Sequence, residues 1–124
     1  MSFAAWLAML AGGAVGAPSR YLLDSYIHTN TEGEFPWGTL AINAIGSLLL
    51  GILTGLALEH GLSPTTKVVL GTGFCGAFTT FSTFSFETVR LAEEGATNAA
   101  CRNIAANVVL GTVLAGVGLA VTLR

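Results

Sequence analysis

Residues 71–87 combine small, hydroxyl and aromatic side chains in a way that a lipid-facing helix does not require. Three glycines lie in the first half of the stretch, and six hydroxyl residues fall between Thr72 and Ser85. Four phenylalanines interleave with these hydroxyls: Phe78, Phe81, Phe84 and Phe86. In hydrocarbon every polar group must find a partner inside the protein or in a water-lined cavity. The stretch therefore indicates that something polar is handled inside a membrane.

Further neutral hydrogen-bond donors recur every four residues in two other apolar stretches. One set is Thr39, Asn43 and Ser47, and the other is Asn103 and Asn107. Because a helix places residues four apart on one face, each set predicts a polar stripe. An Asn near the middle of a membrane span is costly unless it forms hydrogen bonds. We therefore expect Asn43 to face protein or water.

The positions of the ionisable residues limit which reactions or transport mechanisms the chain could support. No carboxylate or histidine lies deep in an apolar stretch, and Glu87 comes closest. A proton-coupled pump would be expected to keep an ionisable relay in the membrane, and a serine hydrolase needs a base beside its nucleophile. This pattern argues against an enzyme and suits a small anion that accepts hydrogen bonds strongly. Phe81 and Phe84 could turn the positive edges of their rings toward such an anion, with core packing as the alternative.

The composition is that of an integral membrane protein. Of its 124 residues, 52% are hydrophobic and 10% are charged, whereas about 25% are charged in a typical soluble domain. The formal net charge of −2 excludes a broad basic surface for nucleic acid. The cysteines fit no disulfide or zinc spacing. We expect one all-α membrane domain that covers residues 1–124.

Four apolar segments are long enough to span a bilayer, which takes about 20 residues. The expected spans are residues 3–23, 38–58, 66–89 and 99–123, with connections at 24–37 and 90–97. The first segment lacks the basic start of a signal peptide, so we interpret it as a span. Ser63 followed by Pro64 predicts the start of the third helix. The glycines followed by Thr79 and Thr80 predict a break in that helix near the bilayer middle.

Four spans would place both termini on the same side of the membrane. Lys67 and Arg124 then lie toward the terminal side, and Arg20, Arg90 and Arg102 lie toward the other. Two cations against three is almost no bias, so the positive-inside rule does not fix an orientation. This balance predicts an antiparallel homodimer. Eight helices could also enclose a pore that four could hardly shield from lipid.

Three motifs resemble those of the Fluc (CrcB) fluoride channels. The sequence Gly-Phe-Cys-Gly-Ala-Phe-Thr-Thr-Phe-Ser-Thr-Phe-Ser-Phe-Glu at 73–87 looks like the third-helix signature of that family. Pro-Trp-Gly-Thr-Leu-Ala-Ile-Asn at 36–43 resembles its second-helix motif. Gly-Ala-Pro-Ser-Arg at 16–20 is similar to its Gly-Ala-x-x-Arg. The motifs occur in the family's order, and the four-span layout matches over the whole chain.

The resemblance implies a set of pore residues. Phe81 and Phe84 match the two pore phenylalanines, whose ring edges contact the anion. Asn43 matches the pore asparagine. Ser82 and Thr83 match a polar track beside the phenylalanines.

The resemblance also implies roles at the edges of the pore. Arg20 would lie at the vestibule and attract anions, with ordinary snorkelling at a helix end as the alternative. Glu87 matches a glutamate near the pore, with an i,i+3 pair to Arg90 as the alternative. Asn103 stands where many relatives carry Tyr. Asn107, one turn later, stands where they carry Ser or Asn.

The implied assembly is an antiparallel, dual-topology homodimer with two fluoride pores, each lined by both subunits. Gly76 and Thr79 match positions whose backbone carbonyls bind a central Na⁺ at the dimer interface. The implied function is passive export of fluoride across a prokaryotic inner membrane. Fluoride enters as neutral HF, ionises in the cytoplasm and is trapped there. A negative-inside potential would drive the anion out, at about 2.3 kcal/mol per charge for 100 mV.

Two other functions stay open. A small dual-topology multidrug exporter also has four spans, but it would be expected to hold a membrane-embedded Glu in the first span, where this sequence has no carboxylate. A structural or assembly membrane protein would use the polar helices only to hold its neighbours together.

Overall fold

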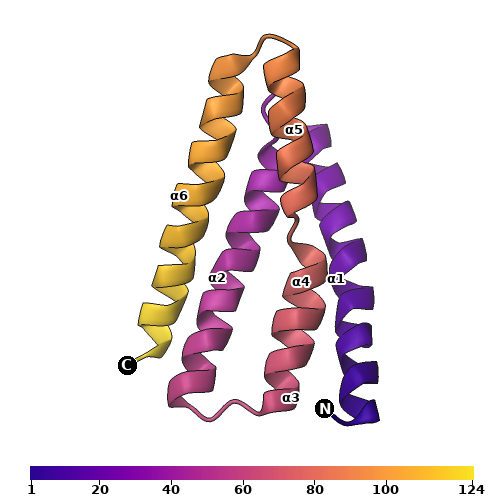
Figure 1. The fold of residues 1–124 in the computed structure, drawn as a ribbon, viewed down its shortest axis with the longest axis vertical. Coiled ribbons are helices and arrows are strands. Elements are labelled where there is room, and N and C mark those ends of the chain that lie inside the picture. Colours follow the sequence, from indigo (N-terminus) through magenta and orange to yellow (C-terminus); the bar gives the residue numbers. More distant parts are fainter.

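The computed structural model describes residues 1–124, and its only secondary structure is helical, which confirms the all-α part of the prediction (Figure 1). Three helices are long and continuous: α1 (Phe3–Asn30), α2 (Trp37–Glu59) and α6 (Thr97–Thr122). The remaining helical arm has four segments: α3 (Pro64–Lys67), the π-helix η1 (Val68–Cys75), α4 (Gly76–Phe78) and α5 (Phe81–Glu93). This segmented arm is the bent third helix that the sequence predicts.

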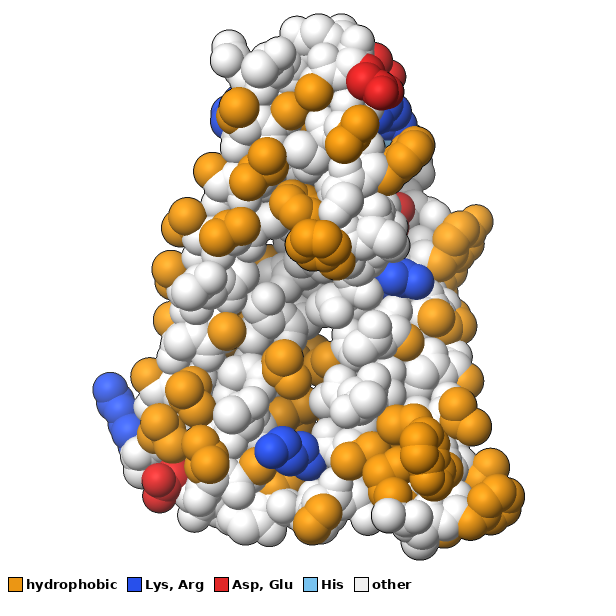
Figure 2. All heavy atoms as spheres, in the orientation of Figure 1, with side chains coloured by type: hydrophobic (Ala, Val, Ile, Leu, Met, Phe, Trp, Pro, Cys, Tyr) orange, Lys and Arg blue, Asp and Glu red, His pale blue; other side chains and the backbone are white.

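Three parts of the chain are long and apolar enough to cross a membrane: Trp37–Glu59, Pro64–Glu93 and Thr97–Thr122. Hydrophobic side chains are spread over the face shown in Figure 2, on which charged side chains are few. The chain is therefore a multi-pass membrane protein. Its two termini lie at the same end of the molecule, as Figure 1 shows.

Two of the expected connections are shorter in the structure. The helix α1 continues to Asn30, so residues 31–36, not 24–37, connect it to α2. The helix α5 continues to Glu93, so residues 94–96, not 90–97, connect it to α6. In the last turns of α1, Thr29 and Asn30 bond the carbonyls four residues earlier, at 2.8 and 2.7 Å. Hydropathy reports only the apolar part of a helix, so it does not predict these polar turns as helical.

The start of the third helix agrees with its sequence signal. Ser63 is the N-cap, and its hydroxyl accepts a hydrogen bond from the Thr66 N–H at 3.1 Å. The π-helical stretch η1 was not predicted. At its end the Gly76 N–H bonds the carbonyl of Gly71, five residues earlier. Such wide turns are rare and are frequent at functional sites.

Glycines let α1 lie directly against η1. A Cβ atom built on Gly12 would lie 2.5 Å from the Val69 carbonyl oxygen, and one on Gly16 would lie 2.5 Å from that of Phe74. A Cβ on Gly73 would lie 2.5 Å from the Met9 oxygen. In each case the atom that the added Cβ would meet belongs to the backbone, which cannot move aside as a side chain can. The small residues therefore fix the contact between the first helix and the segmented arm.

Gly16→Ala is expected to destabilise the fold by about 1–3 kcal/mol, because the added methyl group overpacks this contact. The matched control is Gly13→Ala, whose Cβ would be 3.6 Å from its nearest neighbour, the Gly73 oxygen. Both changes bring the same gain in helix propensity. Unfolding of the two variants in detergent is monitored by circular dichroism. The difference between their free energies of unfolding then measures the effect of packing at Gly16. Equal stability of the two would show that α1 and η1 are not in close contact.

Candidate functional site

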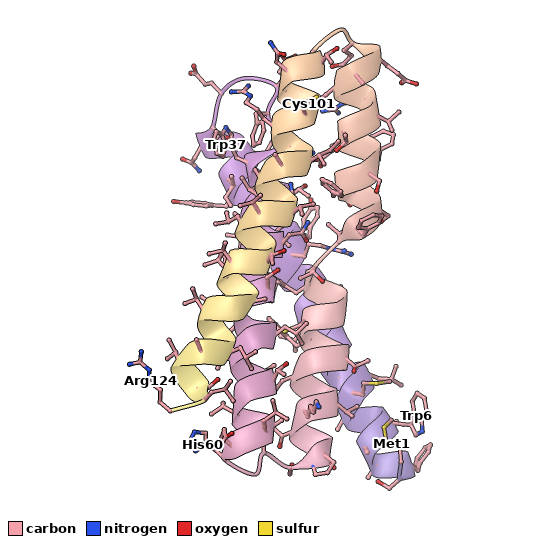
Figure 3. All side chains as sticks on the ribbon, turned by 60° about the vertical axis from the view of Figure 1, so that its left-hand side comes forward. Met1, Trp6, Trp37, His60, Cys101 and Arg124 are labelled. Carbon is pink, nitrogen blue, oxygen red and sulfur yellow. The ribbon has the colours of Figure 1, made fainter.

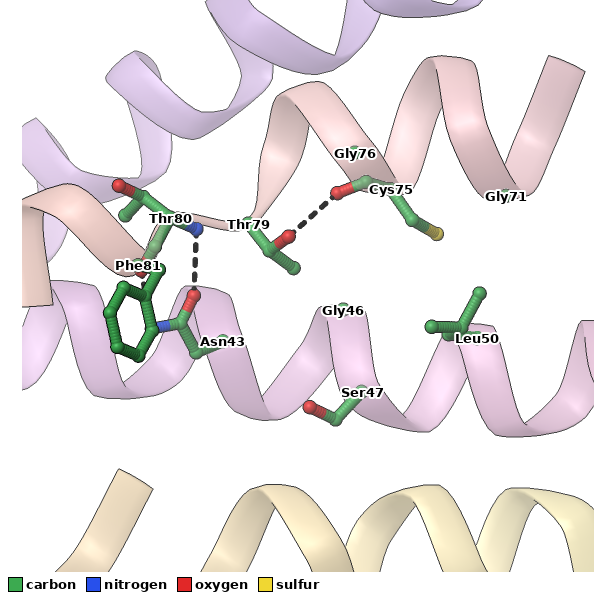
Figure 4. A pocket seen from close by; sticks show the side chains of 10 residues that line it. All are labelled: Asn43, Gly46, Ser47, Leu50, Gly71, Cys75, Gly76, Thr79, Thr80 and Phe81. Atoms are coloured by element: carbon green, nitrogen blue, oxygen red, sulfur yellow. Dashed lines mark hydrogen bonds between the residues drawn. The ribbon is translucent and has the colours of Figure 1, made fainter. Parts of the chain in front are cut away.

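The break in the segmented arm is an extended pair of residues, Thr79 and Thr80, with ψ angles of 161° and 123°. The Thr79 N–H bonds the Cys75 carbonyl at 2.9 Å, and the Thr79 carbonyl accepts from Arg20 Nη1 at 3.1 Å. Asn43 Oδ1 accepts from the Thr80 N–H at 2.9 Å, and Asn43 Nδ2 donates to the Thr80 carbonyl at 3.0 Å. Figure 4 shows Asn43 on α2 next to Thr80, with a dashed line for the bond from the Thr80 N–H. Every backbone polar group of the break therefore has a partner, as burial in a membrane requires.

Arg20 reaches the break from within α1. Position 20 lies well inside α1, which ends at Asn30, so its side chain is not at a helix end. The sequence indicated a place for Arg20 toward the membrane side away from the termini, whereas the structure places its side chain beside the break. Its guanidinium lies beside the Thr79 carbonyl.

The three asparagines form one chain of hydrogen bonds. Asn43 Nδ2 donates to Asn107 Oδ1 at 3.1 Å, and Asn107 Nδ2 donates to Asn103 Oδ1 at 2.9 Å. Asn103 is fully buried, and its Nδ2 donates to Thr88 Oγ1 at 2.9 Å. Thr88 in turn donates to the Phe84 carbonyl at 2.7 Å. This amide chain links α2 through α6 to α5 and fixes the rotamer of Asn43.

Glu87 is held by the second helix. Thr39, which is 2% exposed, donates its hydroxyl to Glu87 Oε1 at 2.9 Å. The other carboxyl oxygen of Glu87 is buried and has no hydrogen-bond partner. Arg90 lies 3.8 Å from Glu94 and makes no ion pair with Glu87. The alternative i,i+3 pair is therefore not formed.

The aromatic and hydroxyl residues after the break lie at the start of α5. The rings of Phe81 and Phe84 are 5.6 Å apart between centroids and are inclined by 58°. The Thr80 hydroxyl donates to Thr83 Oγ1 at 3.0 Å and lies 3.4 Å from Ser82 Oγ. Phe81 is 79% exposed on the surface of the chain. The hydroxyls next to the break thus bond one another, whereas Ser85 bonds the carbonyl four residues earlier.

A cavity of about 300 Å³ lies beside the break (Figure 4). It is lined by Asn43, Gly46, Ser47, Leu50, Gly71, Cys75, Gly76, Thr79, Thr80 and Phe81. It brings the polar face of α2 together with the glycine-rich part of the segmented arm. A Cβ on Gly46 would collide with the methyl group of Thr79. The glycine therefore lets the break approach α2.

The chain is similar to one family of known proteins. The family model of CrcB-like proteins, described as "Camphor Resistance (CrcB)", matches residues 7–119. The fluoride-specific ion channel FluC 1 of Streptomyces avermitilis is 50% identical over 93% of this chain and 94% of its own length. FluC 1 of Frankia casuarinae is 48% identical over 93% of this chain and 89% of its own. FluC 2 of Bacillus subtilis is 48% identical over 94% of this chain and 86% of its own. This chain belongs to the CrcB (FluC) family.

Proposed function

We propose that this chain forms a fluoride-selective channel through which fluoride leaves the cytoplasm passively. The observation that carries the proposal is the 50% identity to a fluoride-specific ion channel over 93% of the chain. Relatives of this kind occur in several bacteria, which supports a place in a bacterial inner membrane. Membership of a channel family also assigns the protein to transport, not to enzymes.

The proposed path passes the break. Fluoride holds its water tightly, so a pore must replace that shell with donors at several sites, none of them too tight to leave. Ser82 and Thr83 supply hydroxyls, and Phe81 and Phe84 supply positive ring edges. Both N–H groups of Asn43 bond Thr80 and Asn107 in this structure, so Asn43 would turn one of them to the passing anion. Chloride is larger and a weaker acceptor, so a narrow path of this kind would discriminate against it.

Four further side chains are proposed as supports or neighbours of the path. Asn107 and Asn103 hold the Asn43 amide through the hydrogen bonds described above. Glu87, fixed by Thr39, would lie beside the path. Arg20 would act at the break, where its guanidinium meets the Thr79 carbonyl.

The second copy that completes each pore is proposed to be antiparallel. Phe81 is 79% exposed in one chain, and the cavity beside it is open, so a partner surface is needed to enclose an anion. Arg20 lies at the break and is not counted with either end. Lys67 and Arg124 then lie at one end of the molecule, and Arg90 and Arg102 lie at the other. Two against two gives no orientation signal. Either orientation can therefore insert, as a dual-topology pair requires.

We propose that α1 is the fourth span of a single membrane domain at 1–124. Its 28 residues give a helix of roughly 42 Å at 1.5 Å per residue, longer than the hydrocarbon core. It also packs against η1, which belongs to one of the apolar segments. Its polar last turns would extend beyond the bilayer.

Backbone carbonyls at the break suit the proposed Na⁺ at the dimer interface. The Thr80 N–H, four residues after Gly76, bonds Asn43 instead of the Gly76 carbonyl. The Gly76 oxygen thus lacks its usual helical donor. The Thr79 oxygen accepts one hydrogen bond from Arg20 and keeps a second lone pair. Gly76 and Thr79 can therefore both offer oxygen atoms, the ligand type that hard cations prefer.

Neither alternative function has an observation in its favour. Asp24 lies within α1, but it is near the end of that helix and packs against Gly38 in α2. It is thus poorly placed as the central carboxylate of a multidrug exporter. A purely structural protein would leave the similarity to fluoride-specific channels without a cause.

The test is anion efflux from liposomes that contain the purified protein, read with fluoride and chloride electrodes. We expect rapid fluoride release and no chloride release, because the donors replace the hydration shell of the smaller anion only. Equal release of both anions would contradict the selectivity argument. No release from protein that is folded and dimeric would favour the structural alternative.

A further inference from the structure

A groove between α2 and α6 takes no part in the polar site. Its volume is about 390 Å³, and it lies at the end of the molecule where residues 31–36 connect α1 to α2. It is lined by Phe35, Trp37, Leu40, Arg102, Ala105 and Ala106. On α6, positions 102, 105 and 106 share one helix face, whereas Asn103 and Asn107 lie on another. The groove therefore faces away from the amide chain.

Arg102 gives the groove a positive charge that forms no ion pair within the chain. Its guanidinium carbon lies 5.6 Å from the centroid of the Phe35 ring, so a cation–π contact orients it. The ion pair that the structure contains joins Arg90 to Glu94, and no hydrogen bond joins Arg102 to another protein group through its side chain. Arg102 is exposed. Its five N–H donors are thus free to bind an oxyanion from outside the protein.

The groove lies at the depth of lipid headgroups. Trp37 is the first residue of an apolar segment long enough to cross the membrane, and it is 49% exposed. Its ring is 4.6 Å from that of Phe35, between centroids. Figure 3 shows Trp37 and Cys101, the neighbour of Arg102, near the same end of the molecule. Exposed tryptophans of this kind mark the membrane–water interface.

We propose that this groove binds an anionic phospholipid. The phosphate would accept hydrogen bonds from Arg102, and one acyl chain would lie along Ala105 and Ala106, whose small side chains leave room over Leu40. A zwitterionic lipid carries its own cation next to the phosphate, which weakens the attraction to Arg102. Basic pockets between helices at a membrane surface recognise anionic headgroups on this principle. In an antiparallel pair, each leaflet would hold one such lipid.

The test is native mass spectrometry of the purified full chain, titrated in detergent with phosphatidylglycerol or with phosphatidylcholine of the same acyl chains. Phosphatidylglycerol is expected to bind more tightly. Arg102→Gln should weaken its binding about fivefold, the effect of one cation at a membrane surface. Ala105→Phe, which fills the groove and keeps the charge, should also weaken it. Arg124→Gln, the same charge change at the other end of the molecule, should not.

Three results would overturn the proposal. One is equal loss in the variants of Arg102 and Arg124, which would indicate unspecific attraction of charge. Another is equal affinity for the two lipids. The third is displacement of phosphatidylglycerol by millimolar inorganic phosphate with no effect of Ala105→Phe, which would indicate a phosphate site without a lipid tail. Circular dichroism and gel filtration check that the variants fold, and fluoride efflux is a separate measurement.

Discussion

Asn43→Ala is expected to lower fluoride efflux roughly 10- to 100-fold. The amide donates to the Thr80 carbonyl and accepts from the Thr80 N–H, so its removal leaves two backbone groups without partners. It also removes the bond to Asn107 and the N–H group that would turn to the anion in the proposed path. A hydrogen bond to a charged group contributes about 1.5–3 kcal/mol, and each 1.4 kcal/mol is a factor of ten. Efflux from liposomes at equal protein density measures the loss.

Ser47→Ala is the matched control for this prediction. Ser47 is one turn further along α2 and lines the same cavity, but its side chain bonds no protein group. We expect its efflux to stay within about twofold of the parent, in line with the small effect of most substitutions away from such networks.

Asn43→Asp gives a second comparison. A carboxylate can accept from the Thr80 N–H but cannot donate to its carbonyl, and its charge repels fluoride. Parental efflux from both Asn43 variants would exclude this residue from the path.

Much of the fold follows from local sequence signals. Ser63 and Pro64 start the segmented arm where their cap pattern indicates, and Thr79 and Thr80 interrupt it where the glycines and hydroxyls predict. The helix ends at Asn30 and Glu93 were not predicted, because polar turns continue a helix beyond its apolar part. The π-helix η1 was also missed. It lies in close contact with α1, a tertiary contact that a local sequence pattern does not report.

The sequence indicates which polar residues share a helix face, but not how they are connected to one another. The spacing of Asn43, Asn103 and Asn107 predicts polar helix faces, yet it cannot show that the three amides bond one another. The partner of Glu87 is Thr39 on another helix, and the sequence suggested a neighbour on its own helix. Long-range pairs of this kind depend on how the helices pack. Arg20 is the clearest case, because its role depends on its depth in the bundle.

Arg20→Met is expected to lower fluoride efflux by an amount similar to Asn43→Ala, roughly 10- to 100-fold. Methionine keeps the long apolar stem of the side chain but removes the donor to the Thr79 carbonyl. Without that donor the carbonyl is left unpaired at the break, and the extended pair loses its support from α1. Arg20→Lys keeps a donor and a charge on a slightly shorter stem. We therefore expect the lysine variant to retain more efflux than the methionine variant.

The salt dependence of this loss separates two roles for Arg20. If the guanidinium acts mainly as a distant attractor of anions, salt will screen it, since the Debye length falls from about 30 Å at 0.01 M to about 8 Å at 0.15 M. The difference between the parent and Arg20→Met would then shrink as salt is added. The 3.1 Å contact with the Thr79 carbonyl predicts the opposite. A short, partly buried hydrogen bond is screened little, so the ratio of the two efflux rates should be the same at both salt concentrations. If the ratio of parent to Arg20→Met efflux falls toward one as salt is added, Arg20 acts in the vestibule. Asn43 would then be the residue that supports the break.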